Sequence, residues 1–236
     1  MIQSAKIKFP RWEVDPEPDS QLVSGLSGEV NIPANIVKIL ANRGINTSEA
    51  VRRFLDPQIS DLQDPFNLYG MDKGIERANK ALMTNEKIVI YGDYDVDGIT
   101  ATSLLYIVFN KLGAQVDFFL PNRLVEGYGL SREGIDEANK LGVSLIITVD
   151  TGINAIEEVA YANSLGIDVI ITDHHEPREI LPEAVAIINP KRPECSFNEE
   201  LSGVGVAFKF AQALYKTLAQ DERDLLEHLD LVALGT

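Results

Sequence analysis

The chain has 236 residues and a formal net charge of −15, with 45% hydrophobic and 24% charged residues. This composition is ordinary for a globular protein of one or two domains, and so acidic a chain is not expected to bind polyanions without a metal ion or a local basic patch. The single Cys195 excludes an internal disulfide. Because neither a signal pattern nor a membrane-length apolar run is visible, we expect a cytoplasmic protein that contacts no membrane.

Residues 1–76 are predicted to form a small extended and helical N-terminal region. The polar stretch 1–31, which prolines interrupt, is expected to run extended along the surface. A helix is predicted over residues 33–42, and Thr47 or Ser48 would cap the helix that follows it.

From Lys87 onward, short apolar stretches alternate with helical ones. Strands are predicted over residues 88–90, 116–120, 144–149 and 168–172, with 184–188 as a further candidate. Helices are predicted over residues 75–83, 99–112, 154–165, 204–218 and 225–234, and from Ser131. Alternation at this spacing is typical of βαβ units. We therefore expect an α/β fold with a doubly wound, mostly parallel sheet over residues 77–236.

Three aspartates occupy alternate positions in the loop that follows the strand predicted over 88–90. Asp93, Asp95 and Asp97 would therefore lie at the carboxyl edge of the sheet, where open α/β folds bind ligands. Two unit charges about 4 Å apart repel by roughly 4 kcal/mol at an effective dielectric near 20, and a bridging cation removes that cost. The alternative is a solvated acidic turn in which one aspartate caps the next helix.

Two more polar clusters follow later strands. Asp150 comes directly after the strand at 144–149, and Asp173, His174 and His175 come after the strand at 168–172. Because the ends of parallel strands share one edge, these side chains should converge with the aspartate loop. Carboxylate and imidazole ligands suit Mn²⁺, Mg²⁺ or Zn²⁺, and two such ions could activate water against a phosphoryl group. Taken singly, an Asx turn at Asp150 and two backbone-bonded loop histidines are alternatives.

Three of these stretches resemble the first motifs of the DHH phosphoesterases. They are Gly92–Gly98, Val149–Gly152 and Asp173–His175. Four further stretches narrow the resemblance to the bacterial exonucleases of that family that are specific for single-stranded DNA: Pro121–Arg123, Glu126–Ser131, Asn189–Arg192 and Ser202–Lys209. The similarity runs from about Arg43 to Thr236 and corresponds to the N-terminal half of the family's catalytic core.

The resemblance implies a Mn²⁺- or Mg²⁺-dependent enzyme that degrades single-stranded DNA from its 5′ end in repair and recombination. The implied metal ligands are Asp95, Asp97, Asp150 and His174, with Asp150 bridging two ions. Asp93 would support the site from close by, and His175 would face the phosphate as a hydrogen-bond donor or proton carrier.

The resemblance also suggests substrate contacts on two loops. Arg123, Lys191 and Arg192 are candidates for contacts with backbone phosphates, and Tyr128 is a candidate for stacking on a base. An equally good interpretation is that all four are ordinary surface residues. Tyr91 stands where other DHH phosphoesterases carry a histidine, four residues before the first ligating aspartate.

In the family, a further metal-binding aspartate, a second core domain and an OB-type nucleic-acid domain follow the position of Thr236. We therefore expect this sequence to be part of a longer protein and weak or inactive alone, with one carboxylate ligand beyond Thr236. A helicase or a single-strand-binding protein would be a partner in repair.

Two other functions stay open at this point. One is a DHH phosphodiesterase for short oligonucleotides or cyclic dinucleotides, against which the stretches 121–131 and 203–209 argue. The other is a metal-free scaffold, like the DHH relative of the eukaryotic replication machinery that no longer cleaves DNA. A scaffold has no need of such a charge cluster, and the intact set of Asp95, Asp97, Asp150 and His174 therefore argues against one.

Overall fold

The computed structural model describes residues 13–121, 129–197 and 200–236. The chain divides into two compact units, Met1–Leu62 and Gln63–Thr236. Arg123 and Tyr128, two of the predicted substrate contacts, lie outside the described residues. Within the described part of the chain, no helix has the length and apolar character that a membrane span requires.

The first unit contains three short helices around a small apolar core. They are α1 (Ser20–Val30), α2 (Ala34–Asn42) and α3 (Ser48–Leu55), followed by the 3₁₀ turn η1 (Ile59–Asp61). The predicted helix over 33–42 is confirmed, and Thr47 caps α3 by accepting the N–H of Ala50.

The prediction that residues 1–31 run extended is wrong for α1. Asp19 caps this helix by accepting the N–H of Gln21 at 2.8 Å, so the acidic stretch supplies a helix start. Val23 and Leu26 lie one turn apart, and both bury themselves with Val37 in the core of this unit.

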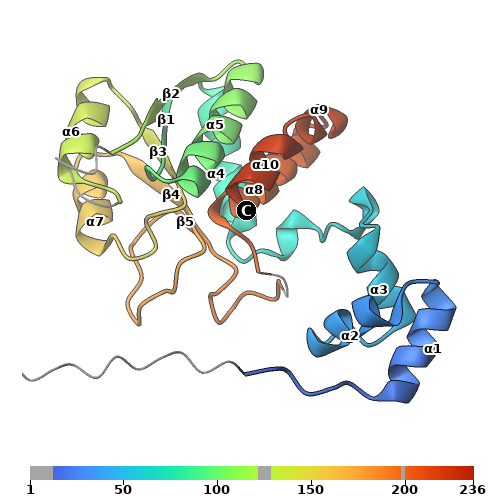
Figure 1. The fold of residues 1–236 in the computed structure, drawn as a ribbon. Helices are drawn as coiled ribbons and strands as arrows, with labels where there is room; N and C mark the ends of the chain where they lie inside the picture. Colours follow the sequence, from blue (N-terminus) through green and yellow to red (C-terminus); the bar gives the residue numbers. More distant parts are fainter. Residues whose placement is uncertain (1–12, 122–128, 198–199) are drawn as a thin grey trace, which may run out of the picture. The chain divides into compact units, whose positions relative to one another are not determined.

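The second unit is built on a five-stranded parallel sheet, which confirms the predicted α/β fold (Figure 1). The strands are β1 (Lys87–Tyr91), β2 (Gln115–Phe119), β3 (Leu145–Val149), β4 (Asp168–Thr172) and β5 (Ala186–Ile188). Their order is β2-β1-β3-β4-β5, and every pair of neighbours is parallel. The carboxyl ends of β1, β3 and β4 are therefore neighbours at one edge.

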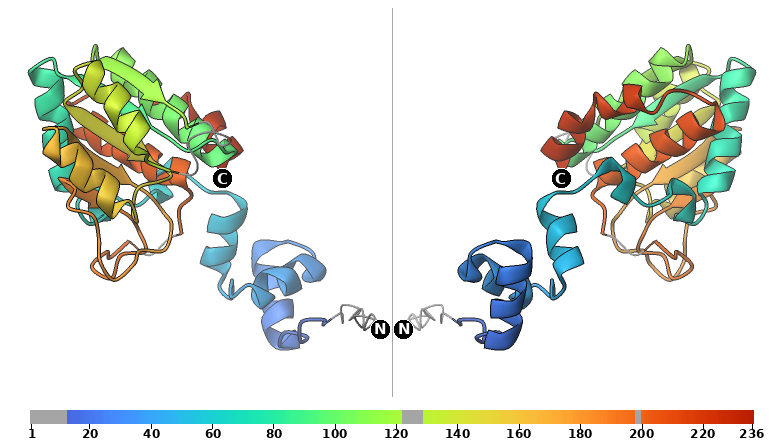
Figure 2. Two further views of the ribbon diagram at one scale, coloured as in Figure 1. Left: turned by 90° about the vertical axis from the view of Figure 1, so that its left-hand side faces the viewer. Right: turned by 90° about the vertical axis from the view of Figure 1, so that its right-hand side faces the viewer.

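Helices cover both faces of this sheet (Figure 2). Apart from the 3₁₀ turn η2 (Pro65–Asn67), they are α4 (Met71–Met83), α5 (Val96–Lys111), α6 (Arg132–Lys140), α7 (Ile156–Ser164), α8 (Gly203–Thr217), α9 (Arg223–Leu226) and α10 (Leu229–Gly235). Alternation along β1 sends Ile88 and Ile90 into a core with α4, α5 and α8, and sends Val89 and Tyr91 into a core with α6 and α7.

The single helix predicted over 225–234 is two helices, α9 and α10. The break between them lets each helix contact a different part of α5. An ion pair of 2.7 Å joins Asp224 to Lys111 in the last turn of α5. Gly235, at the end of α10, lies directly against Thr100 of α5, so a Cβ there would meet the Thr100 hydroxyl.

An ion network ties the amino ends of the central strands to α4. Arg77, only 8% exposed, donates to Asp168 of β4 at 2.5 Å and to Glu86, just before β1, at 2.6 Å. Glu86 also accepts hydrogen bonds from Ser144 and Thr84. Burial by itself raises the pKa of Glu86, but the hydrogen bonds from Arg77, Ser144 and Thr84 together lower it to about 2.

This network predicts how stability depends on pH. The Glu86→Gln variant should lose about 1–3 kcal/mol of unfolding free energy at pH 7, because a charged acceptor is removed from a partly buried site. Since the pKa of Glu86 falls from 4.5 to about 2 on folding, its contribution is present above pH 4.5 and is lost as the pH falls towards 2. Urea unfolding across this range measures both effects.

The matched control is Glu76→Gln, on the exposed side of α4, the helix that carries Arg77. This variant should unfold like the unmodified chain at every pH. A Glu86→Gln variant that is as stable as the unmodified chain at pH 7 would contradict the role of the network.

Candidate metal centre

The aspartate loop turns directly from β1 into α5. Asp95 caps α5, and its Oδ1 accepts the N–H of Gly98 at 2.9 Å. A Cβ on Gly98 would lie 2.6 Å from the carbonyl oxygen of Asp93, so only glycine lets the helix approach the loop this closely. Asp93 is 1% exposed and accepts the N–H of Tyr94 at 2.7 Å. Burial raises its pKa.

Asp97 binds the N-terminus of α8, more than a hundred residues later in the chain. Its Oδ2 accepts the N–H of Gly203 at 2.7 Å, and its Oδ1 accepts the N–H of Val204 at 2.6 Å. These N–H groups carry the positive end of the helix dipole, which favours a carboxylate. Asp97 thereby fixes the start of α8 beside the other acidic residues.

Asp150 follows β3 in a left-handed conformation, with φ of 58°, and is 1% exposed. Gly203 packs against it, because a Cβ on Gly203 would lie 2.5 Å from Asp150 Oδ1. Burial raises the pKa of Asp150 to about 6, and the charges of Asp97 and Asp95 add to that rise. His174 lowers this pKa only in part.

The Asp150 carboxylate has an unsatisfied oxygen. His174 Nε2 lies 3.0 Å from Oδ1, close enough for an electrostatic attraction. Among the residues that the structure describes, no group makes a well-aligned hydrogen bond to the buried Oδ1. A buried acceptor of this kind is costly unless a further group, such as a cation, binds it. The same attraction raises the pKa of His174.

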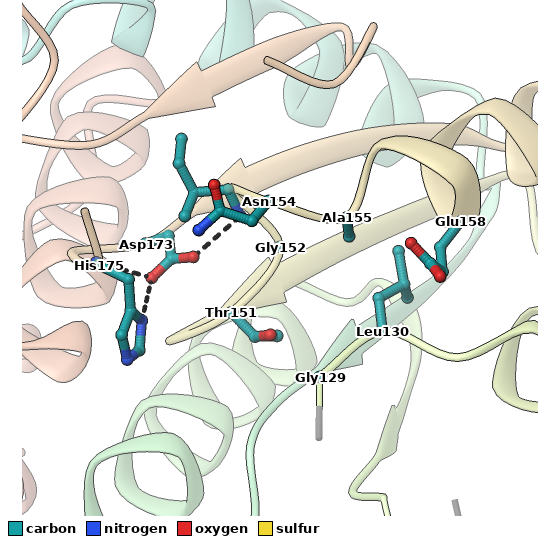
Figure 3. A pocket seen from close by; sticks show the side chains of 10 residues that line it. Gly129, Leu130, Thr151, Gly152, Asn154, Ala155, Glu158, Asp173 and His175 are labelled. Carbon is teal, nitrogen blue, oxygen red and sulfur yellow. Dashed lines mark hydrogen bonds and ion pairs between the residues drawn. The ribbon is translucent and has the colours of Figure 1, made fainter. Parts of the chain in front are cut away.

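Asp173 holds the two histidines that follow it, and Figure 3 shows its contact with His175. Its Oδ1 lies 2.7 Å from His175 Nδ1 and accepts the N–H groups of His174 and His175, while its Oδ2 accepts the N–H of Ile153. Burial by itself raises the pKa of Asp173, but these hydrogen bonds outweigh it and lower the pKa. The hydrogen bond to Asp173 raises the pKa of His175.

The sequence alone assigns no role to Asp173 and therefore misses that Asp173 holds the two histidines. Asp173 is the first residue of the Asp-His-His stretch, and the sequence places it at a strand end but carries no sign of its hydrogen bonds. It acts as a support that fixes the backbone and one ring. A cavity of about 230 Å³ opens beside His175, with Thr151, Glu158 and Leu130 among its lining residues (Figure 3).

The donor atoms fit a divalent cation in two overlapping groups. Asp93, Asp95 and Asp150 offer oxygens within 4.8 Å of one another, and Asp150, His174 and His175 offer oxygen and nitrogen atoms within the same distance. Asp150 is shared by both groups. Oxygen and imidazole donors without a thiolate suit Mn²⁺, Mg²⁺ or Zn²⁺. The unsatisfied Asp150 Oδ1 is a position that such an ion would fill.

Of the residues predicted to contact substrate, Lys191 is partly exposed and Arg192 is largely buried. Lys191 has a 38% exposed side chain and pairs with Glu176 at 3.1 Å. Arg192 has an 11% exposed side chain, donates to the carbonyl of Ile187, and lies 4.6 Å from the centre of the Tyr69 ring. Its guanidinium is thus used within the protein.

Tyr91, at the position of the histidine in other DHH phosphoesterases, points away from the acidic cluster. It is fully buried in the core with α6 and α7, and its ring stacks on Phe119 with centroids 4.8 Å apart. Its hydroxyl accepts the N–H of Ser131, the N-cap residue of α6.

Fold and site together define an α/β protein with a candidate metal centre of carboxylates and imidazoles at the carboxyl edge of a parallel sheet. The chain belongs to the DHH family: residues 87–236 match the N-terminal domain of that family.

Similar proteins agree with this assignment. The chain is 46% identical to the single-stranded-DNA-specific exonuclease RecJ of Bacillus subtilis, over 96% of this chain and 28% of that protein. It is 40% identical to RecJ of Escherichia coli, over 98% of this chain and 40% of that protein. The crystal structure of Thermus thermophilus RecJ in complex with Mn²⁺ superposes with a TM-score of 0.78 at 29% identity, covering 96% of this chain and 31% of that one. The chain thus spans well under half the length of these relatives.

The strained state of Asp150 leads to a prediction. In the absence of divalent ions, Asp150→Asn should raise the free energy of unfolding at pH 8 by about 1–3 kcal/mol. The folded-state pKa is about 6 instead of 3.8, so the charged carboxylate destabilises the fold above pH 6 and this cost disappears as the pH falls towards 3.8. Asparagine also tolerates the left-handed backbone at this position.

Mn²⁺ should reverse the order of stability, so that the unmodified chain becomes more stable than Asp150→Asn. It should raise the melting temperature of the unmodified chain, because an ion that binds only the native state stabilises it, and should shift Asp150→Asn little. Differential scanning fluorimetry with and without Mn²⁺ measures this, with Asp117→Asn on the exposed part of β2 as the control. Equal Mn²⁺ shifts in the unmodified chain and in Asp150→Asn would show that the ion binds elsewhere.

Proposed function

We propose that this chain is the metal-dependent phosphodiesterase part of an exonuclease that removes nucleotides from the 5′ end of single-stranded DNA. The observation that carries the proposal is the pair of donor groups that share the buried Asp150 at the carboxyl edge of the sheet. The names of the relatives, which are exonucleases specific for single-stranded DNA, support the choice of substrate.

In this proposal Asp95, Asp97, Asp150 and His174 would hold Mn²⁺ or Mg²⁺, and Asp150, which both donor groups share, would serve two ions; Asp97 lies outside both groups. The hydrogen bonds of Asp97 to α8 are compatible with this role, since each carboxylate oxygen has two lone pairs. Asp93 is buried and supports the loop from inside. When bound, the two ions would stabilise the negative charge that develops on the transferred phosphoryl group.

His175 is the residue that we assign to the phosphate. With Nδ1 bonded to Asp173, its Nε2 is the ring nitrogen that would donate to a phosphate oxygen or carry a proton to the leaving group. The hydrogen bond to Asp173 raises the pKa of His175, which favours the hydrogen-bond-donating form of the ring. Its 43% exposed side chain keeps it accessible beside the cavity.

Substrate binding is proposed for Lys191 and Arg192 on the loop after β5, and for Arg123 and Tyr128. Lys191 is available for a phosphate, because its ion pair with the largely exposed Glu176 is weak and can be exchanged. Arg192 would have to leave Tyr69 and the carbonyl of Ile187 before it could contact DNA.

The direct test is a digestion assay with Mn²⁺ and DNA that is labelled at its 5′ or 3′ end. The chain should release label from the 5′ end of a single strand and leave duplex DNA intact. The rate should be low, because the chain spans only 28–40% of the two compared exonucleases, and should rise when the remaining sequence is supplied. Asp150→Asn should remove the activity. Release from the 3′ end, or faster cleavage of a dinucleotide than of a long strand, would contradict the proposal.

A second prediction separates the two histidines. His174→Ala should lose both Mn²⁺ affinity and hydrolysis, since His174 contacts the Asp150 carboxylate. His175→Ala should lose hydrolysis by about 100-fold or more while Mn²⁺ affinity stays within a few-fold, because its role is at the phosphate. Isothermal titration with Mn²⁺ and the digestion rate measure the two effects.

His228→Ala, at the start of α10, is the control and should change neither quantity. Equal loss of Mn²⁺ affinity in the two variants of the Asp-His-His stretch would show that the division of roles is wrong.

A further inference from the structure

The segment that carries the two histidines has no regular secondary structure. After β4 ends at Thr172, residues 173–180 belong to no helix or strand. The polar groups of such a backbone must find partners among side chains or water. Asp173 supplies acceptors for the N–H groups of His174 and His175, at 2.7 and 3.1 Å. The carbonyl groups of His175 and of the next residue, Glu176, need hydrogen-bond donors instead.

Two asparagines supply those donors to consecutive carbonyls. Asn189 Nδ2 donates to the carbonyl of His175 at 2.9 Å, and Asn154 Nδ2 donates to the carbonyl of Glu176 at 3.1 Å. Each asparagine also accepts a backbone N–H through its side-chain oxygen, from Lys191 for Asn189 and from Arg178 for Asn154. Both amide groups are thus used as donor and acceptor at once.

The two asparagines reach the segment from different parts of the fold. Asn189 follows β5 and is 0% exposed, while Asn154 precedes α7 and lines the cavity beside His175 (Figure 3). The ion pair between Lys191 and Glu176 also joins the loop after β5 to the histidine segment. Because Glu176 is 82% exposed, that pair adds little to the stability of the segment. The contacts of the two asparagine side chains, of which Asn189 is buried and Asn154 is half-buried, therefore carry most of the restraint on this backbone.

We propose that Asn154 and Asn189 are positioning residues that fix the backbone after His175 and so hold its ring towards the phosphate. This inference rests on the proposed function of His175. Asp173 fixes one ring nitrogen, but the ring also follows its own backbone, which the two carbonyl contacts hold on the C-terminal side together with the N–H of Arg178 bonded to Asn154. Loss of such outer contacts lowers activity by about 10–100-fold in comparable sites, because a small displacement spoils the reacting geometry.

The test variants are Asn154→Asp and Asn189→Asp. Aspartate has the same shape and keeps the oxygen that accepts from Arg178 or Lys191, but it loses the donor and places a negative charge against a carbonyl. Asn163→Asp is the matched control, because Asn163 donates in the same way to the carbonyl of Glu183, away from the site, at 2.9 Å. Asn154→Gln retains both the donor and the acceptor and should recover part of the loss.

Three measurements on the same variants decide the matter. Amide hydrogen exchange over residues 173–178, with Mg²⁺ present, should accelerate by about tenfold in both aspartate variants. Mn²⁺ affinity by titration should stay within about threefold, since neither asparagine belongs to the donor groups. The rate of DNA hydrolysis at saturating substrate should fall by about 10–100-fold with little change in KM. Asn163→Asp should change none of these.

Unchanged exchange over residues 173–178 in both aspartate variants would overturn the inference, as would an equal loss of rate in Asn163→Asp. A loss of Mn²⁺ affinity in parallel with the rate would overturn it too, because that would mean a general collapse of the site. If the unmodified chain binds Mn²⁺ but hydrolyses no DNA even when the remaining sequence is supplied, the proposed function fails. The exchange measurement then still decides whether the two asparagines hold the histidine segment.

Discussion

The burial of several carboxylates at one edge of the sheet is the constraint on which the rest of this site depends. Asp93 and Asp150 are each 1% exposed, and burial raises the pKa of both. Backbone N–H groups offset part of the cost: those of Tyr94 and Gly98 in the loop itself, and those at the start of α8, which bind Asp97. The pKa of Asp150 is still raised to about 6. The fold thus gathers negative charge that its own groups do not neutralise, and a divalent cation would complete it.

The two edges of the sheet show the same problem with different solutions. At the amino edge, Arg77 lies between Asp168 and Glu86, and the pKa of Glu86 falls to about 2. At the carboxyl edge the neighbour of Asp150 is His174, whose attraction is weaker and which leaves one oxygen unsatisfied. The first arrangement pairs opposite charges within the chain and stabilises it. The second costs stability in the absence of a cation, which is common at functional sites.

The sequence predicts the sheet and the convergence of its strand ends, because hydrophobic periodicity and the geometry of parallel strands depend on local pattern alone. It does not predict contacts that depend on distant segments. The hydrogen bonds of Asp97 with the start of α8 and the burial of Arg192 against Tyr69 belong to this class. The helix α1 escapes prediction because a single cap at Asp19 outweighs a polar, proline-rich context. The support that Asp173 gives to both histidines is invisible until the chain folds.

The most direct measurement is anomalous diffraction from crystals of this chain soaked in Mn²⁺. The account predicts a manganese peak within bonding distance of Asp150 Oδ1, shared with His174 or with the carboxylate of Asp95, since these are the atoms that the fold brings together around an unsatisfied oxygen. A manganese peak that leaves Asp150 without a ligand bond, or no peak at this edge under saturating Mn²⁺, would contradict the account.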